Sequence, residues 1–480
     1  MKILIGRKEE QKLVKECFES DRSELVSVYG RHGVGKTYLI KRCFDEKFDF
    51  WFTGIYKATR AQQLDRFQSE LFEKSGVKIN KIKDWFQAFD ELKKYLLSLN
   101  KKKVVVFLDE IPWMDTPKSS FLAAFSYFWN MWPSEKTLLK LYVCGSATTW
   151  MIDKFVGDKG GIYGRITSSI YLAPFNLGET EEYLEKVKQI ELNRYQILEL
   201  YMILGGIPYY LDMLRKDLPL SKNIDYLFFK ENANLKTEYE FLFRSLFKES
   251  KPYRKVVEAL SLKKKGLTRE EIVEITKISD GGTLTEILNN LNRCDFIREY
   301  KAIGKEQREC LYQLTDLFTL FYLNFVKYGN SQDASFWSNT SFSGERNAWA
   351  GYSFEQVCLH HIRQIKSKLS ILGVLSNIYS WNSKGFIDSD GTKWNGGQID
   401  LLIDRNDDVI NICEIKYCND EFVITDEYEE KLRKRASLFK KVTKTKKALQ
   451  HVFITTYGVK KNKHSGIMQA EVTMDDLFQK

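Results

Sequence analysis

A glycine-rich loop near the start of the chain has the spacing of a phosphate-binding site. Residues 30–37 read GRHGVGKT and match the pattern G-x-x-x-x-G-K-[ST]. Glycines in such a loop let backbone N–H groups wrap phosphate oxygens, and a helix that begins there adds a favourable dipole. Lys36 would neutralise the charge of the β- and γ-phosphates, and Thr37 would offer its hydroxyl to Mg²⁺. We therefore predict a nucleoside-triphosphate site rather than a chance glycine turn. Its glycines are Gly30, Gly33 and Gly35.

An acidic pair downstream of this loop fits the same chemistry. Asp109 and Glu110 directly follow the apolar run 104–108. Asp109 can hold Mg²⁺ through water, and Glu110 can orient or deprotonate the attacking water. Alone, such a pair is usually a solvated strand end. Behind a phosphate-binding loop, we interpret it as the partner motif of a phosphate-transfer site.

Two further side chains are weaker candidates. Ser146 ends the apolar run 141–145, where a polar group could sense the γ-phosphate. Arg165 lies between Gly164 and Ile166, where it could project as an arginine finger, within the same chain or from a neighbouring copy. A turn hydroxyl and a surface arginine explain these residues equally well, so both alternatives stay open.

Two strand-like segments near the end of the chain carry carboxylates and a lysine among apolar residues. Residues 398–404 and 409–417 alternate as strands, with a turn between them. Glu414 and Lys416 therefore point to the same face. A hairpin through the turn brings Asp400 close to opposite Glu414, whereas a slip of one residue would turn Asp400 to the other face. Burying these charges is costly unless they bind a metal ion or pair with one another.

A predicted helix upstream offers a fourth member of this group. Glu355 shares a helix face with Cys358 and Leu359, at the spacings i+3 and i+4. Together with the strand residues it could form a metal-binding carboxylate cluster. The alternative is a Glu/Lys pair on a solvated sheet face.

A strongly basic segment follows these strands. Residues 431–447 contain nine basic side chains and no acidic one. Interleaved apolar residues such as Leu432 and Leu438 indicate a helix with an apolar seam and a cationic face. Solvated lysines are the common explanation, but beside a carboxylate cluster that could bind a metal ion we favour contact with a nucleic-acid backbone. The basic residues are Lys431, Arg433, Lys434, Arg435, Lys440, Lys441, Lys444, Lys446 and Lys447.

The elements that must position these residues change in type along the chain. Over the first 175 residues, helical segments alternate with continuous apolar runs, which indicates a parallel α/β sheet. The next segment looks wholly helical, broken only at 205–208 by glycine and proline. Three short helices followed by two strand-like stretches then form the outline of a winged helix-turn-helix. The predicted strands are 25–29, 104–108, 138–144, 296–303, 308–314, 373–381, 398–404, 409–417 and 451–457, and the predicted later helices are 252–262, 268–276, 283–293, 345–369 and 427–441.

The third short helix is a poor reader of duplex DNA. Between Thr283 and Arg293 only Arg293 is basic, and Glu286 would be repelled by phosphate. Because phosphate contacts dominate affinity for DNA, this helix favours an internal packing or switch module. The same weakness argues against a chain that is a transcription regulator as a whole.

Composition excludes several classes of protein. The 480 residues carry a net charge of +10, and 43% of them are hydrophobic, which fits a folded protein rather than a disordered one. Eight cysteines form no CxxC pair and five histidines show no zinc-binding spacing. No stretch approaches the roughly 18 uncharged apolar residues of a membrane span. We expect a cytoplasmic protein with reduced thiols.

Four motifs recur in this order in one known group of proteins. They are the start Ile5-Gly6-Arg7-Lys8-Glu9-Glu10, the loop 30–37, Asp109-Glu110, and Gly205-Gly206-Ile207-Pro208. The series resembles the signal-transduction ATPases related to AAA+ proteins, in their prokaryotic "archaeal ATPase" branch. The resemblance implies binding and hydrolysis of ATP with Mg²⁺ and a winged helix docked behind a helical lid. It also implies that Gly206 and Pro208 sense the nucleotide and that Arg7 and Glu9 flank the adenine.

The C-terminal residues resemble a second family, the PD-(D/E)xK nucleases, whose fold is often fused to these ATPases. The signature is an acid on a first helix, an aspartate on one strand and Glu-x-Lys on the next. Glu355, Asp400 and Glu414-Ile415-Lys416 match it. The resemblance implies that Asp400 and Glu414 ligate Mg²⁺ with the Ile415 carbonyl, that Lys416 positions or activates the attacking water, and that Glu355 completes the shell.

The expected fold class is therefore α/β, in four parts. We expect an ATPase that acts through a metal-dependent nuclease-like domain on nucleic acid, DNA rather than RNA. The rival is a nucleotide-gated regulator whose C-terminal domain is an inactive binding module. A homo-oligomer is required only if Arg165 acts on a neighbour. The parts are a P-loop AAA-like core at 1–178, a helical lid at 179–248, a winged helix-turn-helix at 249–330 and a restriction-endonuclease-like domain at 331–480.

Overall fold

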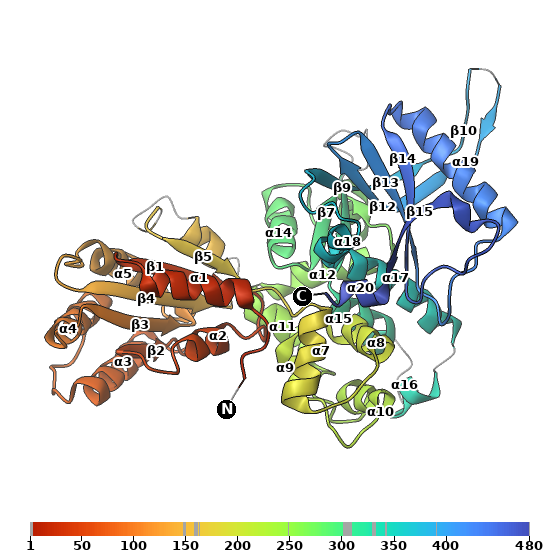
Figure 1. The fold of residues 1–480 in the computed structure, drawn as a ribbon. Helices are drawn as coiled ribbons and strands as arrows, with labels where there is room; N and C mark the ends of the chain where they lie inside the picture. The colour runs from red at the N-terminus through yellow and green to blue at the C-terminus, as the bar shows by residue number, and fades with distance from the viewer. Residues whose placement is uncertain are drawn as a thin grey trace. The chain divides into compact units, whose positions relative to one another are not determined.

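The chain forms two compact units in a computed structural model (Figure 1). The first unit comprises Met1–Pro174 and Phe241–Ser250, and the second comprises Phe175–Glu240 and Lys251–Lys480. Each unit has its own sheet and its own buried apolar residues. The structure describes residues 3–146, 150–157, 162, 164–247, 249–300, 310–328, 333–340, 343–389 and 391–479.

A five-stranded parallel sheet forms the centre of the first unit, in the order β2-β3-β4-β1-β5. The predicted α/β fold with a parallel sheet is confirmed. Parallel neighbours need crossover connections, and helices supply most of them. The strands are β1 (Glu24–Tyr29), β2 (Phe50–Thr53), β3 (Lys103–Asp109), β4 (Leu138–Gly145) and β5 (Ser168–Tyr171). The helices are α1 (Lys8–Glu19), α2 (Lys36–Cys43), α3 (Arg60–Ser75), α4 (Trp85–Ser98), α5 (Phe121–Asn130) and the short η1 (Ile111–Trp113) and η2 (Met151–Val156).

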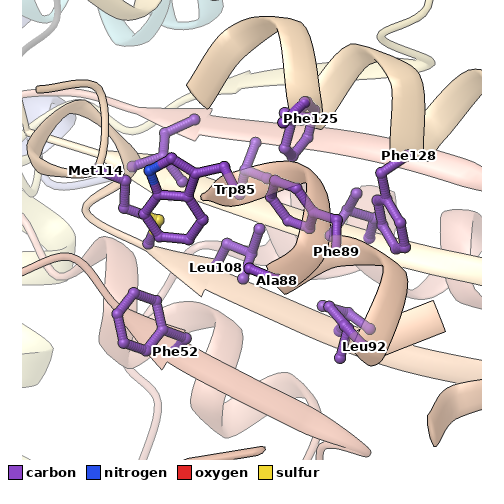
Figure 2. Packing of buried hydrophobic residues seen from close by; sticks show 14 of the residues in the cluster. Phe52, Trp85, Ala88, Phe89, Leu92, Leu108, Met114, Phe125 and Phe128 are labelled. Atoms are coloured by element: carbon purple, nitrogen blue, oxygen red, sulfur yellow. The ribbon is translucent and has the colours of Figure 1, made fainter. Parts of the chain in front are cut away.

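The two faces of this sheet are covered by different helices. Alternate residues of β3 and β4 pack on α3, α4 and α5, where Trp85 and Phe89 lie at the centre of an aromatic cluster (Figure 2). The Trp85 and Phe121 rings meet at 5.0 Å. The intervening residues face α1 and α2, where the Tyr142 hydroxyl donates to the Val14 carbonyl at 3.1 Å. Because side chains alternate, the last residue of β3 points to the α2 side.

The second unit begins with short helices packed around α8, in which seven of the eleven residues are buried. α8 ends at Gly205, which takes the left-handed conformation (φ 66°) that glycine adopts most readily at a helix end. These elements are α7 (Leu177–Tyr183), η3 (Leu184–Lys188), α8 (Arg194–Leu204), α9 (Pro208–Asp212), α10 (Leu220–Ile224), η4 (Asp225–Phe229), α15 (Leu317–Phe321), η6 (Tyr322–Lys327) and α16 (Phe336–Asn339), and the stretch that joins the units forms α11 (Glu238–Leu246).

Three helices and a small antiparallel sheet follow. The two predicted strands come after the three helices, but a further short strand, β6, lies between the first and second helices, where the sequence predicted none. The sheet has the strand order β6-β8-β7. We call this part the α12–β8 segment. Its elements are α12 (Ser250–Ser261), β6 (Leu267–Thr268), α13 (Arg269–Thr276), α14 (Gly282–Arg293), β7 (Ile297–Tyr300) and β8 (Leu311–Leu314).

A mixed five-stranded sheet, in the order β15-β14-β13-β12-β9, dominates the end of the chain. β12 is antiparallel to both β9 and β13, whereas β13, β14 and β15 run parallel. Trp381, Leu402 and Phe439 lie in its core beside α19. The elements are α17 (Gly344–His360), α18 (Ile362–Lys368), β9 (Ser376–Ser383), β10 (Phe386–Ile387), β11 (Lys393–Trp394), β12 (Gly397–Arg405), β13 (Val409–Lys416), α19 (Asp426–Thr443), β14 (Ala448–Thr455), η7 (Ser465–Ile467), β15 (Met468–Thr473) and α20 (Met474–Leu477).

None of the helices in the described parts of the chain has the length and apolar character that crossing a membrane requires.

Candidate functional site

The glycine-rich loop links β1 to α2, as its sequence predicts. All three of its glycines have positive φ, and Gly35 is the residue directly before α2. At Gly30 (φ 151°) a Cβ atom would lie 2.4 Å from the carbonyl oxygen of Leu172. No other residue type fits that conformation without moving the chain. The loop is therefore shaped by its glycines, and its backbone N–H groups are free of the obstruction that side chains would cause.

Lys36 is buried at the base of this loop, with 5% of its surface exposed. Its Nζ donates to the carbonyls of Gly30 and Arg31, both at 3.0 Å. Burial lowers the pKa of Lys36, while the carboxylates of Glu110 and Asp109 oppose that shift. A buried cation beside the backbone of this loop is well placed to bind phosphate oxygens.

Asp109 and Thr37 meet at the first turn of α2. The Thr37 hydroxyl donates to the two carboxylate oxygens of Asp109 at 3.0 and 3.1 Å. Burial raises the pKa of Asp109, and hydrogen bonds from Cys144 and Thr37 oppose it. A carboxylate and a hydroxyl that already touch are oxygen ligands of the kind Mg²⁺ prefers. These two residues therefore fit the predicted Mg²⁺ site.

Glu110 is held by Ser146 at the end of the neighbouring strand. Oε2 of Glu110 accepts hydrogen bonds from the Ser146 backbone N–H at 3.1 Å and from its hydroxyl at 2.8 Å. Ser146 was predicted as a sensor of the γ-phosphate, and the contact that the structure gives its hydroxyl is with Glu110. Glu110 itself has a left-handed backbone (φ 50°), which turns its side chain out of the strand line.

Cys144 is a site residue that the sequence analysis missed. It is fully buried, and its Sγ donates to Oδ1 of Asp109. The signal was present in the sequence, since alternation along β4 places Cys144 on the same face as Tyr142. The thiol helps to fix the aspartate that would hold Mg²⁺.

The remaining predicted residues of the nucleotide site are spread over both units. Arg7 is buried directly before α1, and its guanidinium donates to the Val34 carbonyl at 3.5 Å, so it lies against the glycine-rich loop. Glu9 lies in the first turn of α1. Arg165 is exposed in the first unit.

Gly206 and Pro208 belong to the second unit, at the turn between α8 and α9. There Gly206 (φ 68°) accepts a hydrogen bond from the Phe175 N–H at 2.9 Å. Its Cβ would lie 2.2 Å from the Phe175 carbonyl oxygen. This close approach explains why the turn needs glycine.

A second candidate site lies wholly within the second unit, in a cavity of about 1040 Å³. Its lining includes all four members of the predicted carboxylate–lysine group. β12 pairs with β13 so that Leu401 lies opposite Cys413, and this register carries Asp400 to the position opposite Glu414. The group is Glu355 on α17, Asp400 on β12, and Glu414 and Lys416 on β13.

Glu414 is the most strongly paired of these residues. It accepts hydrogen bonds from the Tyr428 hydroxyl and from Arg435, and Lys416 lies 3.0 Å from its Oε1. Burial acts against ionisation, but Arg435 and Lys416 outweigh it, so the pKa of Glu414 lies below its usual value. Burial likewise opposes charge on Lys416, and the Glu414 carboxylate keeps the pKa of Lys416 above its usual value.

The surroundings of Glu355 raise its pKa, whereas those of Glu414 lower the pKa of Glu414. Burial and the nearby Asp400 carboxylate raise the pKa of Glu355 to about 8, against the influence of Lys264 and Lys416. Asp400 accepts a hydrogen bond from the Gln398 side chain at 2.7 Å. A buried carboxyl group whose pKa is raised by a neighbouring carboxylate marks a place where a cation would be stabilising.

The donor set therefore has the right chemistry for Mg²⁺, but its side chains are not gathered for coordination. Among the described residues, no group of three or more His, Cys, Asp or Glu side chains is arranged to hold a metal ion. Both oxygens of Glu414 are engaged by cations. Metal binding here requires Glu414 to exchange one of its present partners for the ion.

The basic segment contributes to the same cavity, and it is less cationic than its sequence window suggests. α19 begins at Asp426, so acids just before the window join the helix and pair with it. Five of the nine basic residues form ion pairs. The pairs are Arg433–Glu429, Lys434–Glu430, Arg435–Glu414, Lys441–Asp388 and Lys447–Asp404.

Several cavity residues come from a part of the chain that sequence reasoning did not connect with this site. Lys264, Lys265, Arg298 and Gln313 belong to the α12–β8 segment, and they line the cavity together with the carboxylates. About a hundred residues separate Arg298 from Asp400. No local pattern links them, because only tertiary packing brings the two together.

Comparison with known proteins bears on the first of the two sites. Residues 4–214 match the family model of an ATPase domain predominantly from Archaea. That range contains the glycine-rich loop, the acidic pair and the glycine–proline turn. The predicted ATPase domain is thereby supported, and so is ATP as the nucleotide with its usual Mg²⁺.

Relatives of longer coverage are distant. The chain is 24% identical over 420 residues to the uncharacterized protein MJECL04 of Methanocaldococcus jannaschii, covering 86% of this chain and 88% of that protein. Among solved structures, the Walker-type ATPase PABY2304 of Pyrococcus abyssi is 20% identical with a TM-score of 0.49, covering 67% of this chain and 96% of that one. The ORC2 protein of Aeropyrum pernix is 16% identical with a TM-score of 0.46, covering 67% and 93%.

Proposed function

We propose that this protein is a cytoplasmic ATP-hydrolysing AAA-like ATPase joined to a metal-dependent nuclease-like domain that acts on nucleic acid, DNA rather than RNA. The match of residues 4–214 and the shape of the glycine-rich loop support the ATPase. The single observation that carries the nuclease-like part is that four chemistry-bearing side chains line one cavity. They are Glu355, Asp400, Glu414 and Lys416.

In the proposed ATPase, different residues would bind the phosphates, hold Mg²⁺ and activate the attacking water. The loop N–H groups and Lys36 bind the β- and γ-phosphates, and Thr37 and Asp109 hold Mg²⁺. Glu110, fixed by Ser146, orients the attacking water and accepts its proton. Each of these residues lies at the carboxyl end of a parallel strand or in the first turn of the helix behind it, where such sheets bind ligands.

In the nuclease-like cavity, Asp400 and Glu414 would hold Mg²⁺, and Glu355 would complete the ligand set. When bound, the ion polarises the phosphodiester and lowers the pKa of water. In the site without an ion, the Glu414 carboxylate raises the pKa of Lys416. With the ion held by Glu414, Lys416 would position or activate the attacking water. The α12–β8 segment acts as a winged helix that relays the nucleotide state, and an oligomer follows only if Arg165 acts in trans.

A second candidate function is supported by a specific observation. Because Glu414 is already paired with Arg435 and Lys416, the cavity is electrostatically satisfied on one side without a metal. A domain of this kind would bind nucleic acid as an ATP-gated module and would not cut it.

Cleavage assays separate the two functions. Purified protein should cut single-stranded or duplex DNA in Mg²⁺ or Mn²⁺, and Asp400→Asn should abolish cutting while it retains the fold. Lys36→Ala, which removes ATP binding without touching the cavity, shows whether cutting depends on the nucleotide. The nuclease assignment is wrong if DNA and RNA remain intact with wild type and Asp400→Asn alike, while DNA binding persists.

A separate assay tests the ATPase. Glu110→Gln should retain the wild-type Kd for ATP and lose turnover, because the carboxylate is replaced by an amide of the same shape. Undiminished phosphate release by Glu110→Gln would refute the role given to Glu110.

A further inference from the structure

The α12–β8 segment contributes side chains to the cavity of the nuclease-like domain. Lys264 and Lys265 precede β6, Arg298 and Tyr300 lie on β7, and all four line the cavity together with the residues of β12 and β13 that carry the carboxylates. The contact is anchored at α17, where the Tyr352 hydroxyl donates to the Leu314 carbonyl at 3.2 Å. Both groups of residues belong to the second unit.

Arg298 is positioned by two contacts with its own segment. Its Nε donates to Oε1 of Gln313 at 2.6 Å, and its guanidinium lies over the Tyr300 ring at 4.4 Å. Gln313 is buried and donates in turn to the Lys264 carbonyl at 2.7 Å. The guanidinium is therefore held in one orientation rather than left to swing in solvent.

The Arg298 guanidinium has N–H donors that the described residues do not use. A guanidinium has five N–H groups, and the described residues use one of them. No carboxylate among the described residues pairs with Arg298, although Asp400 and Glu355 act on it through space. Burial lowers the pKa of Arg298, and the charges of Asp400 and Glu355 oppose that shift only in part.

A second, independent observation points to a missing ligand. Gln356, the neighbour of Glu355 on α17, lines the cavity and is completely buried. Neither Nε2 nor Oε1 of this side chain has a hydrogen-bond partner among the described residues. A buried amide without partners is costly, so a group with polar oxygens in the cavity would satisfy it.

The charged side chains that line the cavity indicate which class of ligand it would bind. Eight basic and five acidic side chains line it, so an anion is favoured even before a metal ion adds positive charge. The planar fork of arginine matches the two free oxygens of a phosphodiester. A single carboxylate would satisfy Arg298, but it would not use the basic residues farther along the cavity.

We propose that Arg298, presented by the α12–β8 segment and positioned by Gln313, is a phosphate-binding residue of the nuclease-like site, and that Lys264 and Gln356 contact the same strand. The inference rests on the proposed function in taking a nucleic-acid strand as the ligand. In this arrangement α17, β12 and β13 supply the metal ligands, and the α12–β8 segment binds the phosphate backbone. The segment then serves the site directly and does not read a DNA groove.

The test measures binding apart from cleavage. A fluorescently labelled single-stranded DNA oligonucleotide is titrated with the full chain in Ca²⁺, at several salt concentrations, and anisotropy gives the Kd. Arg298→Met keeps the apolar stem over Tyr300 and removes the charge. We expect the Kd to rise about 10- to 100-fold, which is the loss expected for a hydrogen-bonded charge pair. The slope of log Kd against log salt concentration should fall by about 0.7, the value for one phosphate contact on a single strand. Arg298→Lys should restore part of the affinity.

Lys255→Ala is the matched control, because Lys255 is an exposed cation of the same segment that does not line the cavity. It should bind as wild type does, and thermal unfolding should show both variants folded. Wild-type affinity and salt slope in Arg298→Met would overturn the proposal, and so would an absence of binding by the wild-type chain.

The outcomes also separate this inference from the proposed function. Binding that depends on Arg298, in a chain that cuts nothing, would support the phosphate contact and remove the nuclease. Cleavage that persists at the wild-type rate in Arg298→Met, with unchanged Kd, would do the reverse.

Discussion

The contact between Ser146 and Glu110 makes a sharp prediction about ATP hydrolysis. Ser146→Ala removes one of the two hydrogen bonds to Oε2 of Glu110, the one from the hydroxyl at 2.8 Å, and leaves the backbone N–H at 3.1 Å. A hydrogen bond to a charged acceptor contributes about 1.5–3 kcal/mol. If that energy holds Glu110 against the attacking water, kcat falls about 10- to 150-fold.

The assay is a double-mutant cycle on phosphate release at saturating ATP and Mg²⁺. Ser146→Ala is measured in the wild-type chain and in Glu110→Gln, and the Kd for ATP is measured for each. Because Ser146 acts through Glu110, its loss should cost less than about twofold once the carboxylate is gone, which is a strongly non-additive result. The Kd for ATP should stay unchanged throughout. Ser146→Thr, which keeps a hydroxyl, is the control.

The competing expectation is that Ser146 contacts the γ-phosphate directly. In that case Ser146→Ala lowers kcat by the same factor in both backgrounds, and the affinity for ATP falls as well. Additive losses would therefore refute the reasoning from the Glu110 contact and restore the sensor role that the sequence first suggested.

Two further predictions concern stability. In calorimetry, Gly30→Ala should lower the melting temperature of the first unit far more than Gly35→Ala does. Both positions have positive φ, but only a Cβ atom at Gly30 would meet a backbone oxygen, at 2.4 Å. Equal effects of the two substitutions would contradict this packing argument. Glu355→Gln should stabilise the second unit in metal-free buffer. The folded chain holds the Glu355 proton up to about pH 8 and the unfolded chain loses it near 4.5, so wild-type stability declines as pH rises between these values. The advantage of the variant should grow across that window to on the order of 5 kcal/mol, and a difference independent of pH would count against it.

The sequence was informative wherever a local pattern determines structure. The apolar runs that end before Asp109 and Ser146 correspond to β3 and β4. β2 and β5 were missed because each has only four residues, and β5 begins with two serines, so neither forms a long apolar run. The predicted helix 345–369 is divided at His361 into α17 and α18, a break that no glycine or proline announces.

In the candidate sites as well, local sequence patterns could be read from the sequence, whereas contacts between distant segments could not. Alternation along β13 placed Glu414 and Lys416 on one face, but the position of Asp400 depended on a register that only the pairing of Leu401 with Cys413 fixes. A bulge in β12 between Ile399 and Leu402, on its β9 side, adds a local irregularity that the sequence does not announce. The ion pairs that neutralise part of α19 were hidden because the acids lie outside the basic window.

The two groups of residues that line the cavity lie at different sequence distances from the first unit, which contains the candidate nucleotide site. The chain leaves the first unit at Ser250 and re-enters the second at Lys251, in the first turn of α12. The group that includes Lys264 and Arg298 is thus covalently continuous with the stretch that the first unit includes. The carboxylates follow much later in the sequence, on α17, β12 and β13. The proposed phosphate-binding residues Lys264 and Arg298 therefore lie nearer in sequence to the first unit than the proposed metal ligands do.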